Sequence, residues 1–152
     1  MSNWLGCLDD RRPVAAVFGE EAPSLDGVMV QRLSADYDAG CVEIVFDLAE
    51  YPENPPGDWV DQGFNVVRVE LAVHGAIGLS VHGWPDVLPA DISIDRDAGL
   101  VWISVAGPDS TGAVTGSMVR VRSISRYHDE ALDLPSGKFR SLRRPSSEAR
   151  DA

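Results

Sequence analysis

The chain is poor in the residues and motifs that most often signal catalysis or metal binding. Its 152 residues include only two cysteines and three histidines. The motifs GxGxxG, GxxxxGK[ST], HExxH and GxSxG, which mark common phosphate-binding, zinc-hydrolase and esterase sites, do not occur. We therefore predict that the protein is not an enzyme and holds no metal or cofactor.

Cysteine pairs and long apolar runs are also scarce. Cys7 and Cys41 form no CxxC pair, and a domain of this size needs no disulfide framework. No stretch approaches the roughly 20 apolar residues of a membrane-spanning helix. The first ten residues lack the basic start and apolar run of a signal peptide. These absences predict a cytoplasmic protein with reduced thiols and no membrane partner.

Positively charged residues are also few. The chain has 13 Lys and Arg but 24 Asp and Glu, which gives a net charge of −11. The imbalance is confined to residues 1–130, with 21 acids and 8 bases, whereas residues 131–152 carry 3 acids and 5 bases. A field of this sign repels nucleic acid and anionic lipid and attracts basic partners. It argues against a nucleic-acid partner and favours a basic macromolecule.

What the sequence does have is a series of short runs in which apolar and polar residues alternate. Alternation with period two predicts half-buried β-strands. In the clearest run, residues 41–48, Val42 and Phe46 should be buried while Glu43 and Asp47 face water. Turns rich in proline and glycine separate the runs, which favours a mainly β protein, an antiparallel sandwich or open barrel. Further strands are predicted at residues 28–33, 64–73, 77–84, 92–94, 101–105 and 113–124.

The firmest of these structural predictions is a β-hairpin. It pairs Val73 with Ile77 and leaves residues 74–76 as a three-residue turn, with a glycine at its centre. This register places the apolar side chains of both strands, including Leu79 and Val81, on one buried face.

The two ends of the chain differ from this pattern. Residues 9–19 predict one short N-terminal helix, capped by an aspartate and ended by Gly19. From about Pro135 onward the apolar periodicity vanishes, which predicts disorder. We therefore expect one β-rich domain over residues 1–130 and a flexible tail over residues 131–152.

The segment from Tyr51 to Trp59 is the most distinctive surface candidate. Its three prolines restrict the backbone, and its two aromatic ends lie among acids, a combination typical of a rigid binding loop. The alternative is that Trp59 belongs to the core, because tryptophan is highly buried on average. The acids of this loop are Glu50, Glu53, Asp58 and Asp61.

Two other function classes stay open from the residues alone. A β module for a carbohydrate or small molecule requires Trp59 and Trp84 to be exposed on one concave face. An enzyme with paired carboxylates requires a buried acid whose pKa is raised. Glu43, Asp47 and Glu70 alternate with apolar residues, which predicts an outward, solvated face and places the enzyme last.

Several stretches, taken in order, resemble the Imm50-type immunity proteins of bacterial polymorphic toxin systems. Together they cover most of residues 10–128. The matching stretches are Phe18–Leu25, Glu43–Tyr51, Tyr51–Trp59, Asn65–Leu71, Leu79–Trp84 and Ser123–Tyr127.

The resemblance implies a small, non-catalytic cytoplasmic protein that binds and neutralises a cognate toxin, by occluding its active surface. The net charge then favours a basic toxin domain. We expect the loop acids named above, with Trp59, to make the first contacts, and Glu43, Asp47 and Glu70 to contribute next.

Overall fold

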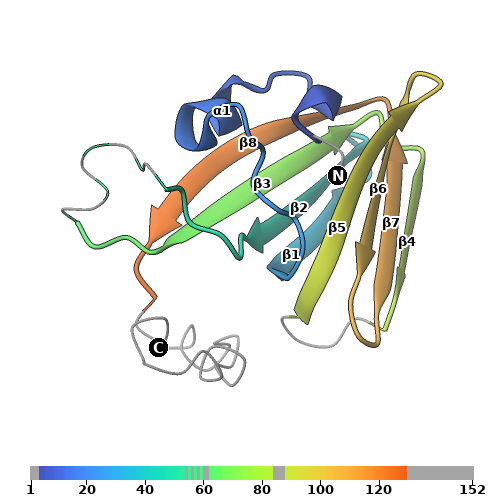
Figure 1. The fold of residues 1–152 in the computed structure, drawn as a ribbon. Coiled ribbons are helices and arrows are strands. Elements are labelled where there is room, and N and C mark those ends of the chain that lie inside the picture. Colours follow the sequence, from blue (N-terminus) through green and yellow to red (C-terminus); the bar gives the residue numbers. More distant parts are fainter. Residues whose placement is uncertain are drawn as a thin grey trace.

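The computed structural model describes residues 4–53, 55, 57, 59, 62–83 and 88–129. Two short helices precede eight strands, as the ribbon in Figure 1 shows. The predicted tail, residues 131–152, lies outside the described residues. The elements are the 3₁₀ helix η1 (Trp4–Cys7), α1 (Arg12–Phe18), β1 (Val28–Asp36), β2 (Cys41–Asp47), β3 (Val66–His74), β4 (Gly78–His82), β5 (Leu88–Asp97), β6 (Leu100–Ala106), β7 (Thr111–Gly116) and β8 (Met118–Tyr127).

All eight strands form one open sheet in the order β4-β7-β6-β5-β1-β2-β3-β8. Every neighbouring pair is antiparallel. The prediction of a mainly β, antiparallel protein with one short N-terminal α-helix is confirmed. Within the described part of the chain, no helix is long and apolar enough to cross a membrane.

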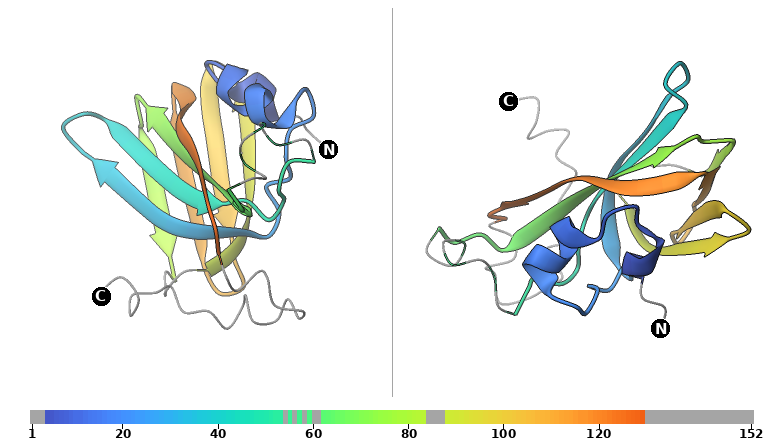
Figure 2. Two further views of the ribbon diagram at one scale, coloured as in Figure 1. Left: turned by 90° about the vertical axis from the view of Figure 1, so that its left-hand side faces the viewer. Right: turned by 90° about the horizontal axis from the view of Figure 1, so that it is seen from above.

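The sheet bends at β5, which belongs to both of its halves. Residues 88–90 of β5 pair with β1, and residues 91–97 pair with β6. The two halves lie at a steep angle, with η1 and α1 on the concave side (Figure 2). Apolar side chains of both halves and both helices therefore form one core, whose fully buried members include Leu5, Val14, Phe46, Leu71, Val101 and Ile103.

Helix α1 agrees with its prediction except at its start. It runs from Arg12 to Phe18, with Pro13 in its first turn, and ends where Gly19 adopts φ 78°. The predicted aspartate is not the N-cap, because that residue is Arg11, which makes no side-chain cap bond. An Asp10 carboxylate oxygen nevertheless accepts a hydrogen bond from the Arg12 backbone N–H at 3.0 Å. Hydrogen bonds from Arg12 lower the pKa of Asp10 to about 2.

The predicted hairpin is wrong. β3 pairs with β2 and β8, whereas β4 crosses to the other half of the sheet and pairs with β7. The turn adopts φ 62° at Gly75, as expected, but the Ile77 N–H then bonds to the Thr115 carbonyl at 2.8 Å instead of returning to Val73. Alternation predicts which side chains of a strand share a face. It does not predict which strand lies beside it, because many strands have the same alternating pattern.

A second correction concerns the end of the sheet. Residues 113–124 form two strands, because β7 ends at Gly116 and β8 begins at Met118. The Ser117 N–H bonds to the His74 carbonyl at 3.0 Å, so the chain turns around the end of β3. β7 then lies in one half of the sheet and β8 in the other.

Candidate functional site

The outward face of β2 and β3 carries Glu43 and Glu70, as predicted, but arginines neutralise much of its charge. The Glu43 carboxylate forms an ion pair with Arg122 and lies 3.8 Å from the guanidinium of Arg32. Glu70 is half-buried on the same face. A basic partner would therefore meet little net negative charge here.

The alternating pattern predicts that Asp47 faces water, and this prediction is wrong, because Asp47 is only 1% exposed. Arg68 donates two hydrogen bonds to its carboxylate, at 2.7 and 3.2 Å. Gln31, the bulged residue of β1, donates a third at 3.1 Å, and the Tyr127 hydroxyl donates a fourth. These side chains cover the carboxylate, so Asp47 links β1, β2, β3 and β8 and offers no surface to a partner.

Trp59 belongs to the core, where it is 6% exposed. Its ring lies 6.1 Å from that of Tyr51, and the guanidinium of Arg126 lies 5.5 Å from its centroid. The core alternative for this tryptophan is confirmed, and the exposed pair that a carbohydrate module requires is not formed. Three other residues of these predictions, Asp58, Asp61 and Trp84, lie outside the described residues.

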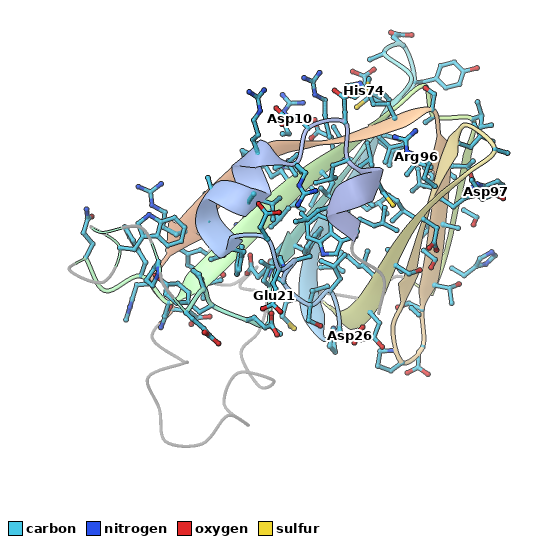
Figure 3. The ribbon with its side chains drawn as sticks, turned by 45° about the horizontal axis from the view of Figure 1, so that its top comes forward. Asp10, Glu21, Asp26, His74, Arg96 and Asp97 are labelled. Atoms are coloured by element: carbon cyan, nitrogen blue, oxygen red, sulfur yellow. The ribbon has the colours of Figure 1, made fainter. Side chains whose placement is uncertain are left out.

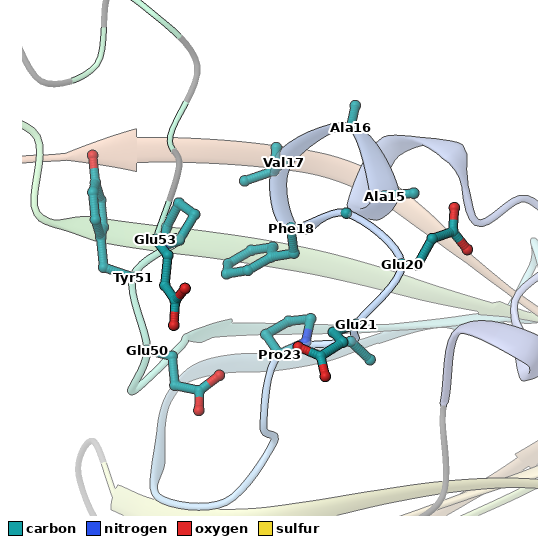
Figure 4. Close-up of a pocket in the computed structure, with 13 residues that line it drawn as sticks. Ala15, Ala16, Val17, Phe18, Glu20, Glu21, Pro23, Glu50, Tyr51 and Glu53 are labelled. Atoms are coloured by element: carbon teal, nitrogen blue, oxygen red, sulfur yellow. The ribbon is translucent and has the colours of Figure 1, made fainter.

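Glu50 and Glu53 lie beside an open hollow between α1 and the segment that leaves β2. Figure 4 shows Phe18 inside it, with the glutamates around the ring. The hollow has a volume of about 1090 Å³ and is lined by residues 15–23 and 50–53. We call it the acidic hollow.

Hydrogen bonds between side chains and backbone hold the walls of the acidic hollow in place. The α1 helix ends at Gly19, and Glu20 and Glu21 follow directly. One carboxylate oxygen of Glu50 accepts a hydrogen bond from the Ser24 backbone N–H at 3.0 Å. The Trp4 indole donates to the Pro23 carbonyl at 2.9 Å, which fixes the same loop on the core.

The acidic hollow has the least balanced charge of the surfaces described above. Four glutamates line it (Glu20, Glu21, Glu50 and Glu53). Among the described residues, Arg11 is the arginine that pairs with one of them, at 2.6 Å from Glu20. The sequence indicates Glu50 and Glu53 but not Glu20 and Glu21, because nothing in the pattern shows that these distant segments meet.

The geometry suits a cationic side chain rather than a metal ion. In the described part of the chain, no three His, Cys, Asp or Glu side chains converge closely enough to hold a metal. The carboxylates can instead form ion pairs with a guanidinium or ammonium group. Phe18 and Tyr51 supply apolar and aromatic surface for the alkyl stem of such a side chain.

The family of this chain follows from comparison with known proteins. A family model described as Imm50, Immunity protein 50, matches residues 10–127, from just before α1 to the end of β8. The chain belongs to the Imm50 family. No match is found among curated proteins. Because Imm50 is a family of non-catalytic immunity proteins, this Imm50 chain is not an enzyme, and its family implies a cognate toxin as partner.

Proposed function

We propose that this Imm50 protein neutralises a basic toxin domain by binding it at the acidic hollow and covering its active surface. The proposal assumes that both proteins meet in the cytoplasm of the producing cell. The observation that carries it is the set of glutamates that line the hollow, with Glu21, Glu50 and Glu53 around Phe18 and Glu20 at the rim (Figure 4), on a member of an immunity family.

Electrostatics favours the acidic hollow over the face that carries Glu43 and Glu70. A charged partner is steered by the net field and then held by local, desolvated contacts. The β2–β3 face has arginines beside its acids, whereas Arg11 alone among the described residues pairs with the hollow. A basic side chain entering the hollow would displace little competing positive charge.

The test uses the toxin domain encoded beside this chain and a double charge reversal, Glu50→Lys with Glu53→Lys. Loss of contact acids should weaken toxin binding at least about tenfold. The matched control is Asp95→Lys with Asp97→Lys, which changes the net charge equally at the β5–β6 hairpin, away from the hollow (Figure 3). Equal losses in both variants would show that only the net field matters and would contradict binding at the hollow.

A further inference from the structure

The end of the sheet formed by β4, β7 and β6 carries no charged side chain. These three strands contain no Asp, Glu, Lys or Arg, although 24% of the whole chain is charged. Their outward face presents small and polar residues around the half-exposed ring of Trp102. Interfaces between proteins are depleted of charge at their centres in the same way. We call this region the uncharged sheet end.

Its outermost strand, β4, is an open edge. In the described part of the chain no strand pairs with its free side. Soluble proteins usually protect such an edge with lysine, proline, a bulge or a covering segment, because it pairs readily with another strand. The sequence of β4 is Gly-Leu-Ser-Val-His, which contains none of the protective residues, and its ladder with β7 is regular.

The other edge of the sheet shows what protection looks like in this molecule. β8 carries Arg120, Arg122 and Arg126, and α1 packs against it. The N-terminal segment also pairs with it, through a bridge between Leu8 and Val119. Only the β4 edge is left without charge or cover in the described residues.

The apolar residues at β4 are exposed to an unusual degree. Ile77 is 72% exposed, Leu79 is 43% exposed and Val81 is 37% exposed. Leu79 and Val81 lie opposite Val114 and Gly112 of β7, on the face that is buried elsewhere in the sheet. A further strand beside β4 would continue this face and remove apolar surface from water.

We propose that the β4 strands of two copies of this chain pair antiparallel and form a symmetric dimer with one continuous sheet. A two-fold axis at Ser80 places Leu79 of each copy opposite Val81 of the other. Both cross-strand pairs are apolar, which stabilises pairing. The edge is therefore complementary to itself.

Charge selects the second copy as the occupant. Two chains with net charge −11 repel each other, so they approach most easily where no charge is present. The uncharged sheet end satisfies this condition. A basic toxin gains nothing there and is drawn to the acids elsewhere, so dimerisation and toxin binding use different surfaces.

The first test measures the mass of the full chain by sedimentation equilibrium at micromolar and higher concentrations. A dimer of twice the 16.4 kDa chain mass is expected. A single-chain mass at all concentrations would overturn the proposal. This measurement needs no toxin, so its failure would leave the proposed function untouched.

The second test places a charge on the axis. Ser80→Lys sets two ammonium groups opposite each other, and the dimer dissociation constant should rise about fivefold or more. The control is Ala106→Lys, an exposed position on β6, about 10 Å further into the sheet, which changes the net charge equally. Equal effects of both lysines would overturn pairing at Ser80.

The third test fixes the register. Under mild oxidation, Ser80→Cys should form an intermolecular disulfide, because the two residues face each other across the axis. The wild type, with Cys7 and Cys41, and Ala106→Cys should remain uncrosslinked. A dimer that Ser80→Cys does not trap would lie on another surface. A monomeric chain whose toxin binding is weakened by Ser80→Lys would instead assign β4 to a strand of the toxin, which also overturns the proposal.

Discussion

Two tyrosine hydroxyls in this protein occupy opposite hydrogen-bonding environments. The Tyr51 hydroxyl is buried, finds no partner among the described residues, and has its pKa raised by burial. The Tyr127 hydroxyl donates to the buried carboxylate of Asp47. A buried polar group without a partner costs about 1–3 kcal/mol, whereas a hydrogen bond to a charged group stabilises by about 1.5–3 kcal/mol.

Removing the two hydroxyls should therefore change stability in opposite directions. Tyr51→Phe deletes an unpaired donor and is expected to raise the free energy of unfolding by up to about 1 kcal/mol. Tyr127→Phe deletes a bond to Asp47 and should lower the free energy of unfolding by about 2 kcal/mol. Urea unfolding of both variants measures the difference. A loss of stability in Tyr51→Phe equal to that in Tyr127→Phe would contradict the assignment.

At this scale the sequence predicts the direction of a side chain better than its burial. Glu43, Asp47 and Glu70 do lie on the face opposite the core, as alternation requires. Asp47 is nevertheless buried, because Arg68 and Tyr127 come from strands that the pattern does not place beside it. Burial on an outward face depends on strand order, which single-strand periodicity does not contain.

At the scale of the elements, β7 and the end of β3 approach each other closely at Gly116. A Cβ atom built on Gly116 would lie 2.5 Å from Cγ1 of Val73 and 2.9 Å from the carbonyl oxygen of His74. One of these contacts is with backbone, which cannot rotate away. Glycine at this position allows the two halves of the sheet to meet.

The substitution Gly116→Ala should therefore lower the free energy of unfolding by about 2 kcal/mol through overpacking. The control is Gly78→Ala on β4, where the added Cβ would meet Thr115 at 3.9 Å, an ordinary contact. That variant should keep the wild-type stability or gain up to about 1 kcal/mol. Thermal unfolding followed by circular dichroism compares the two. Similar melting temperatures of the two variants would contradict the prediction, because they would show that the two halves of the sheet can move apart to accommodate the added Cβ.

The existence of the elements was more predictable than their pairing. The short helix, the strands at β1, β2, β5 and β6 and the turns between them all follow from periodicity and turn residues. The partner of β4 does not, because the turn at Gly75 is compatible with a hairpin and with a crossing to β7. The decisive contact, from Ile77 to Thr115, joins residues far apart in the chain.

At the scale of the whole molecule, composition indicates how much charge there is and the fold decides where it lies. The net charge of −11 is readable from the sequence. The fold neutralises acids on the β2–β3 face, brings four glutamates together at the acidic hollow, and leaves the uncharged sheet end free of charge. The protein therefore has one negatively charged surface and one uncharged surface. Associations through these two surfaces should depend differently on salt concentration.

Added salt should have opposite effects on the two associations. Salt screens the attraction between the acidic hollow and a basic toxin, so the association rate constant should fall at least about tenfold between low and high ionic strength. The same screening weakens repulsion between two chains of charge −11, so pairing through β4 should strengthen. Stopped-flow measurements give the toxin association rate constant as a function of salt concentration. Sedimentation equilibrium gives the strength of dimerisation across the same salt series. If the toxin association rate constant and the strength of dimerisation both rise or both fall with salt, this contradicts the assignment of the acidic hollow to the toxin and the uncharged sheet end to a second copy.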